Sequence, residues 1–297
     1  MKLVVHLSAY NWPVATDELG DLLADVAGAT EANDFDGLAV ADHLWQHPIM
    51  DGPEANCIEA YTTLGFLAAH TRSIRLFTVV TGAHFRHPAV LAKTVTTLDV
   101  LSRGRAWLGI GAGHYQEECD ALGVPFPPLA ERFELLEDAL EVCTRMWAGE
   151  QGEDGPFDGH HVHATRLLNV PQSLRRPHPP ILVAGDGERR TLPLVARYAD
   201  ACSLRPTPEI PHKLDVLRRA CDDAGTDYDR IERTCAFAFT ADDGGPATRE
   251  LLGQLEWLAG LGVETVIGRV EGDDPRRAIE LLGKHVVPAA AELGTRS

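Results

Sequence analysis

Eight short apolar runs alternate along the chain with longer segments whose apolar residues recur every three to four positions. Short apolar runs are typical of buried strands, and the longer periodicity is typical of amphipathic helices. The pattern predicts strands at residues 3–7, 37–41, 75–81, 106–110, 181–184, 201–204, 235–240 and 263–267, and helices at 17–33, 58–70, 88–101, 129–147, 189–197, 211–224, 247–261 and 275–292.

Eight strand–helix units in 297 residues predict a (β/α)8 TIM barrel. A doubly wound open sheet is the alternative, but that fold usually carries a glycine-rich turn after its first strand. Residues 8–16 contain no glycine, which favours the barrel. We find no linker and expect one domain over residues 1–297, with an inserted lid at about 149–180, after the fourth unit. Catalytic groups are then expected on the loops that follow the strands.

The charge of the chain limits its partners. A count of 27 Lys and Arg against 44 Asp and Glu gives a formal net charge of −17, which repels nucleic acid and anionic membranes. No stretch approaches the roughly 18 apolar residues of a membrane span, and residues 1–5 lack a signal-peptide core. We therefore expect a cytoplasmic protein that acts on a small molecule and binds neither nucleic acid nor membranes.

Two of the expected loops carry groups suited to acid–base chemistry or anion binding. Asp42 and His43 follow the second strand, and an imidazole titrates near neutral pH. A structural role is equally consistent, with Asp42 capping backbone and His43 packing against Trp45. After the third strand, Gly82 allows close backbone approach, and Arg86 either holds an anion or is paired internally.

Two later loops are rich in glycine. Residues 109–113 contain three glycines and lead to His114, and such a turn lets amide groups face an anion or a planar ring. A dinucleotide fingerprint would require glycine in place of His114. Gly185 and Gly187 precede two arginines at 189–190, and amides at a helix start suit a phosphate, although an ordinary strand–helix turn has the same pattern.

A histidine tract lies in the insertion, at His160, His161 and His163. Imidazole is a common metal ligand, but no cysteine or carboxylate accompanies these residues at ligand spacing. We therefore expect no metal site here.

The order of these features resembles the luciferase-like monooxygenase superfamily, and within it the branch of oxidoreductases that use the deazaflavin coenzyme F420. The resemblance depends on the shared order of many short segments over most of the chain. These segments are residues 41–44, 85–88, 91–93, 101–105, 109–113, 131–133, 157–159, 179–185 and 198–200.

This resemblance implies a barrel that holds a flat tricyclic ring at the carboxyl ends of its strands. Asp42 would contact the ring, and His43 would be the acid or base beside the carbon that carries the hydride. The Val79–Val80 peptide would be cis and press against the ring. Further coenzyme contacts would come from Ala112, Gly113, Glu117, Ala184, Gly185 and Gly187.

Flavin mononucleotide (FMN) is the alternative cofactor, because other branches use it for oxygen chemistry. Those members often have Glu-His-His where this chain has residues 42–44, Asp-His-Leu. A deazaflavin does not readily activate oxygen, so the expected reaction is hydride transfer to or from a small organic substrate. The alternatives are an FMN-dependent monooxygenase and a non-catalytic deazaflavin carrier or sensor.

One position departs from the sugar-phosphate dehydrogenases of this branch. They have a catalytic glutamate where His114 stands, so that specific activity is in doubt. His114 would either replace the acid or line the substrate pocket. The resemblance is also compatible with a homodimer.

Overall fold

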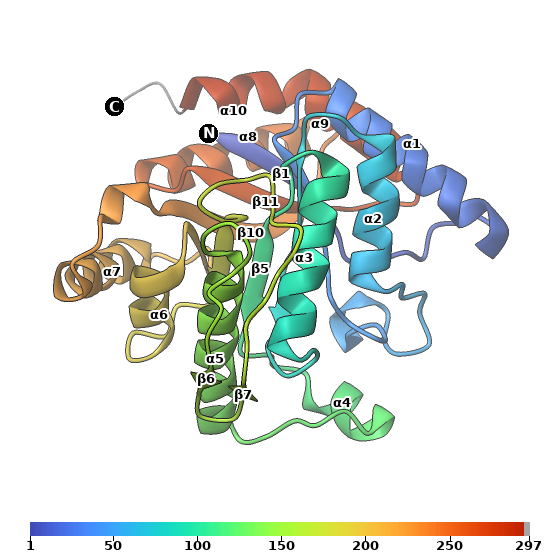
Figure 1. The fold of residues 1–297 in the computed structure, drawn as a ribbon. Helices are drawn as coiled ribbons and strands as arrows, with labels where there is room; N and C mark the ends of the chain where they lie inside the picture. Colours follow the sequence, from blue (N-terminus) through green and yellow to red (C-terminus); the bar gives the residue numbers. More distant parts are fainter. Residues whose placement is uncertain (294–297) are drawn as a thin grey trace.

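Parallel strands form the centre of the fold in the computed structural model, which describes residues 1–293 (Figure 1). The strand order in the sheet is β3-β2-β1-β11-β10-β9-β8-β5-β4. Its two end strands, β3 (Arg75–Thr78) and β4 (Thr81–Gly82), are successive pieces of one chain segment. Leu76 in β3 also bridges Ala106 in parallel, next to β5, so the sheet closes on itself. The predicted eight-stranded barrel is confirmed.

Most of the strands are buried on both faces, as parallel strands covered by helices are. In β1, Leu3 and Val5 belong to the large core between sheet and helices, whereas Val4 belongs to a small cluster inside the barrel. This alternation follows from the two-residue period of a strand. The remaining strands are β1 (Lys2–Leu7), β2 (Gly37–Val40), β5 (Leu108–Gly111), β8 (Ile181–Ala184), β9 (Ala201–Leu204), β10 (Glu232–Phe239) and β11 (Thr265–Val270).

Helices surround the barrel (Figure 1). Several begin with proline in the first two positions, where its missing N–H leaves no helical hydrogen bond unmade. Within residues 1–293, no helix combines the length and the apolar character needed to cross a bilayer. The helices are α1 (Leu19–Ala32), α2 (Ala60–His70), α3 (Pro88–Ser102), α4 (Gln116–Leu122), α5 (Leu129–Trp147), α6 (Thr191–Tyr198), α7 (Ile210–Ala224), α8 (Pro246–Gly260), α9 (Pro275–His285) and α10 (Val287–Leu293).

Some element boundaries differ from the prediction. The strand expected at residues 75–81 is divided into β3 and β4, and the Val79–Val80 peptide between them is cis, as the resemblance implies. The helix expected at 275–292 is two helices, because Pro288 has no N–H to donate to the carbonyl of Lys284. The last four residues of the predicted domain lie outside the described residues.

The insertion at residues 149–180 lies along α3 and α5 and contains a small hairpin of β6 (Phe157–Asp158) and β7 (His163–Ala164) (Figure 1). Asp138 in α5 is buried and accepts hydrogen bonds from the backbone N–H groups of residues 160–162, at 2.8 to 3.0 Å. Asp99 in α3, also buried, accepts from the N–H groups of residues 174–175. Two carboxylates thus fasten the insertion to the barrel helices, and its closure as a lid stays a prediction.

Candidate active site

The two predicted catalytic histidines come from different loops and lie together at the carboxyl ends of the strands. The rings of His43, after β2, and His114, after β5, have centroids 5.6 Å apart and are perpendicular. Tyr115 lies 6.0 Å from His43, and His47 lies 4.7 Å from Tyr115. We call these four side chains the histidine cluster. Their position at this end of the barrel is where barrel enzymes carry out their chemistry.

A buried glutamate holds His43. Oε2 of Glu118, in α4, lies 3.0 Å from Nδ1 of His43. The other oxygen, Oε1, accepts the backbone N–H groups of Leu44 and of Trp45, the latter at 3.1 Å. Burial raises the pKa of Glu118, but these hydrogen bonds outweigh burial and hold the pKa below its usual value. Glu118 is therefore a carboxylate at neutral pH.

The resemblance implies a role for the neighbouring Glu117, which is exposed, and not for Glu118. A helical pattern could have found it. Tyr115, Glu118 and Cys119 have the spacing i, i+3, i+4 of one helix face, and all three are buried. The contact between Glu117 and a coenzyme stays a prediction.

The second histidine of the pair has a neutral ring. Partial desolvation, together with the nearby His43 and His47, lowers the pKa of His114 from its usual value. At neutral pH this side chain is therefore a hydrogen-bonding group without charge, and no carboxylate contacts it within the described residues.

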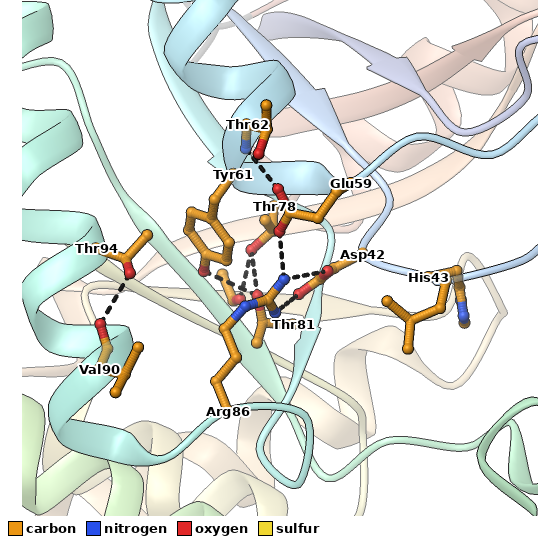
Figure 2. A network of polar contacts seen from close by, with 12 residues as sticks. Asp42, His43, Glu59, Tyr61, Thr62, Thr78, Thr81, Arg86, Val90 and Thr94 are labelled. Atoms are coloured by element: carbon orange, nitrogen blue, oxygen red, sulfur yellow. Dashed lines mark hydrogen bonds and ion pairs between the residues drawn. The ribbon is translucent and has the colours of Figure 1, made fainter. Parts of the chain in front are cut away.

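Asp42 belongs to a polar network beside His43, shown in Figure 2. Its side chain is 1% exposed, and both of its oxygens are bound by Arg86, with 3.0 Å between Oδ1 and Nη2. Arg86 also contacts Glu59 at 2.6 Å and stacks over the ring of Tyr61 at 4.8 Å. The Tyr61 hydroxyl continues the network to Thr81 at 2.8 Å. Arg86 is thus internally paired, and contact between Asp42 and a coenzyme ring stays a prediction.

Small residues form the floor of the site. Val79, Val80 and Ala184 pack against the cluster inside the barrel. A Cβ atom built on Gly111 would lie 3.2 Å from Cγ2 of Val80, so a larger side chain at position 111 would crowd Val80. Gly113 has a positive φ of +80°, a conformation that favours glycine, and it brings the chain close to His84. The resemblance places a planar ring against Val79, Val80 and Ala184, and that contact stays a prediction.

Buried polar atoms at the end of β1 lack partners. His6 and Ser8 follow Val4 on the inner side of the strand, and Nε2 of His6 and Oγ of Ser8 have no hydrogen-bond partner within the described residues. Burial, then the nearby Arg269 and His43, lower the pKa of His6 to about 4. Because buried polar groups normally have partners, these atoms fit the polar edge of a bound molecule.

The loop after β8 has the conformation expected of a glycine turn. Gly185 has a φ of +123°, and a Cβ atom on Gly187 would lie 2.9 Å from Oγ1 of Thr191, at the start of α6. Asp186 pairs with an arginine from the next strand end. Arg189 is exposed and makes no ion pair within the described residues, so its charge is available to an anion.

The histidine tract of the insertion does not converge. His161 contacts Glu134 at 2.8 Å, and His163 contacts Asp158 at 2.6 Å. In residues 1–293, no three histidine, cysteine or acidic side chains are grouped so as to hold a metal ion.

Comparison with known proteins identifies the class to which this fold and site belong. The chain belongs to the luciferase-like monooxygenase family, whose sequence profile matches residues 1–285. This match confirms the resemblance inferred from the sequence.

One relative and two solved structures are similar to this chain. An F420-dependent glucose-6-phosphate dehydrogenase of Kineococcus radiotolerans is 30% identical over 234 residues, which are 74% of this chain and 64% of that protein. The match thus spans less than two thirds of the relative's length. Monooxygenase RslO1 from Streptomyces bottropensis is 21% identical with a TM-score of 0.81, covering 97% of this chain and 99% of its own. An F420-dependent secondary alcohol dehydrogenase, solved with an F420–acetone adduct, is 16% identical with a TM-score of 0.80, covering 98% of this chain and 99% of its own. At these identities the two structures show the fold.

Proposed function

We propose that the protein is an oxidoreductase that transfers a hydride between coenzyme F420 and a small organic substrate. The observation that carries this proposal is the His43 imidazole, which has a buried carboxylate on Nδ1 and no protein partner on Nε2 within the described residues. Such a ring is equipped to move a proton at its free nitrogen. The F420-dependent relative supports the choice of coenzyme.

The residues present fit a deazaflavin. Its ring would lie on the floor of Val79, Val80 and Ala184, with its polar edge toward the unpartnered atoms of His6 and Ser8. When bound, the coenzyme supplies a carbon that accepts or releases a hydride.

The anionic tail of the coenzyme would leave along the loops after β5 and β8. Ala112 and Gly113 would contact it on the first loop, and Gly185 and Gly187 on the second, where Gly113 and Gly185 have positive φ. Arg189 makes no ion pair within the described residues, and its charge, just beyond the second loop, favours a phosphate there.

The chain's own contribution to the reaction is proton transfer and orientation. Nε2 of His43 takes the proton of a substrate hydroxyl as the hydride leaves the adjacent carbon, and it returns the proton when the reaction runs in reverse. The neutral ring of His114, 5.6 Å from His43, lines the same space and offers the substrate oxygen a hydrogen bond.

An FMN-dependent monooxygenase is the second candidate, and the similar fold of monooxygenase RslO1 favours it. Fluorescence titration of the apoprotein with each cofactor separates the two. We expect tighter binding of F420, and selective tight binding of FMN would overturn the cofactor assignment. A passive deazaflavin carrier is excluded if reduced F420 is oxidised when enones, imines or nitro compounds are added.

The catalytic role is tested with His43→Ala. Because acid–base catalysis typically contributes about 10²- to 10⁴-fold, we expect turnover to fall by that factor while coenzyme affinity stays within about tenfold. His47→Ala is the matched control, since His47 belongs to the same cluster but has no carboxylate partner within the described residues. Equal turnover of His43→Ala and the unmodified protein would reject the role.

A further inference from the structure

We infer that Glu118 is a positioning residue that keeps His43 protonated on Nδ1 and leaves Nε2 as the proton acceptor. The tautomer follows from the contacts of the apoprotein. Its catalytic consequence rests on the function proposed above, so the two are tested separately.

Both oxygens of the Glu118 carboxylate are hydrogen-bond acceptors, and each of them has a partner. Oε1 receives two backbone N–H groups, from Leu44 and Trp45, and Oε2 faces Nδ1 of His43 at 3.0 Å. The side chain is fully buried, so no solvent competes for these contacts. The hydrogen between Oε2 and Nδ1 must therefore lie on the imidazole, as an Nδ1–H donor.

A neutral imidazole carries one N–H, so protonation of Nδ1 leaves a lone pair on Nε2. The other side chains around His43 do not impose this choice. His47, His114 and Tyr115 meet it at centroid distances of 5.6 to 6.4 Å, and the neighbouring Asp42 is already bound by an arginine. Within the described residues, Glu118 is the only carboxylate that hydrogen-bonds His43.

The same carboxylate also anchors the loop that carries His43. A shorter side chain at position 118 would therefore disturb both the loop and the imidazole, and the two effects could not be separated. The isosteric Glu118→Gln avoids this problem. Leu44 and Trp45 both donate to Oε1, so the amide oxygen of glutamine is expected to stay there. The amide NH2 group then faces Nδ1 and donates to it, and His43 must carry its proton on Nε2.

The direct test is nitrogen NMR of the apoprotein with 15N-labelled histidine at pH 8, with His43 signals identified by their loss in His43→Ala. We expect Nδ1–H in the unmodified protein and Nε2–H in Glu118→Gln. Asp120→Asn, an exposed position on the same helix, is the matched control and should retain Nδ1–H. An Nε2–H ring in the unmodified protein overturns the inference even if the glutamine variant does not fold.

The kinetic test uses the same variants. With Nε2 already protonated, Glu118→Gln should lose about 10²-fold or more in turnover, while coenzyme affinity stays within about twofold and Asp120→Asn keeps full turnover. An unchanged tautomer in Glu118→Gln overturns the inference. If the tautomer changes in Glu118→Gln but the unmodified protein does not bind F420, the positioning role is supported and the proposed coenzyme is refuted.

Discussion

The ion pair between Asp42 and Arg86 makes an asymmetric prediction about stability. Asp42 has a side chain that is 1% exposed, and Arg86 is its one ion-pair partner within the described residues. Arg86 is 17% exposed and has two further contacts, with Glu59 and with the ring of Tyr61. Removal of the arginine therefore leaves a buried charge alone, whereas removal of the acid leaves a charge that still has partners.

The expected free energies follow from that difference. Arg86→Met should lower the free energy of unfolding by about 3–5 kcal/mol, the usual effect of leaving one buried charge unpaired. Asp42→Asn should lower it by about 1.5–3 kcal/mol, the value of hydrogen bonds to a charged group. The double variant should be more stable than Arg86→Met, because the second change removes the unpaired charge.

Urea unfolding at pH 7, followed by circular dichroism, measures these values. Arg166→Met is the control, since Arg166 and its partner Asp154 are 57% and 39% exposed and such surface pairs contribute about 0–1 kcal/mol. The predicted asymmetry is refuted if Asp42→Asn is the more destabilising single change, or if the double variant is less stable than Arg86→Met.

Two further predictions concern histidines and a glycine near the site. Burial above all lowers the pKa of His6 and of His84 to about 4, so between pH 6.5 and 4 the unfolded chain binds protons that the folded chain does not. As the pH is lowered through this window, the free energy of unfolding should decrease by about 1.4 kcal/mol per pH unit for each ring. Urea unfolding at pH 7 and pH 5 measures this loss, and in His84→Gln the contribution of His84 to it should be absent. Gly113→Ala should lower the melting temperature more than Gly123→Ala, because both have positive φ but only the first places Cβ 2.3 Å from the His84 ring. Equal melting temperatures would contradict the proposed clash.

The barrel was predictable because its determinants are local. Most strands are built around a short apolar run and most helices have one apolar face, and these patterns can be read from neighbouring residues. The same local patterns placed Asp42, His43 and His114 on loops after strands, and closure of the barrel then brings such loops to one end. The helix predicted at 275–292 is divided near Pro288, whose missing N–H does not show in the apolar periodicity.

The partners of the site residues were decided by the tertiary structure alone. Asp42 meets Arg86, 44 positions later, and His43 meets Glu118, 75 positions later. The helical period of α4 places Glu118 on the buried face and Glu117 outside, but no local pattern specifies which distant residue that face meets. That partner depends on how α4 packs against the loop after β2. The apolar pattern of the sequence thus determined where the strands end, and therefore which polar residues follow them. Packing between distant segments determined which atoms those groups touch, because a hydrogen bond requires positions correct to a few tenths of an ångström.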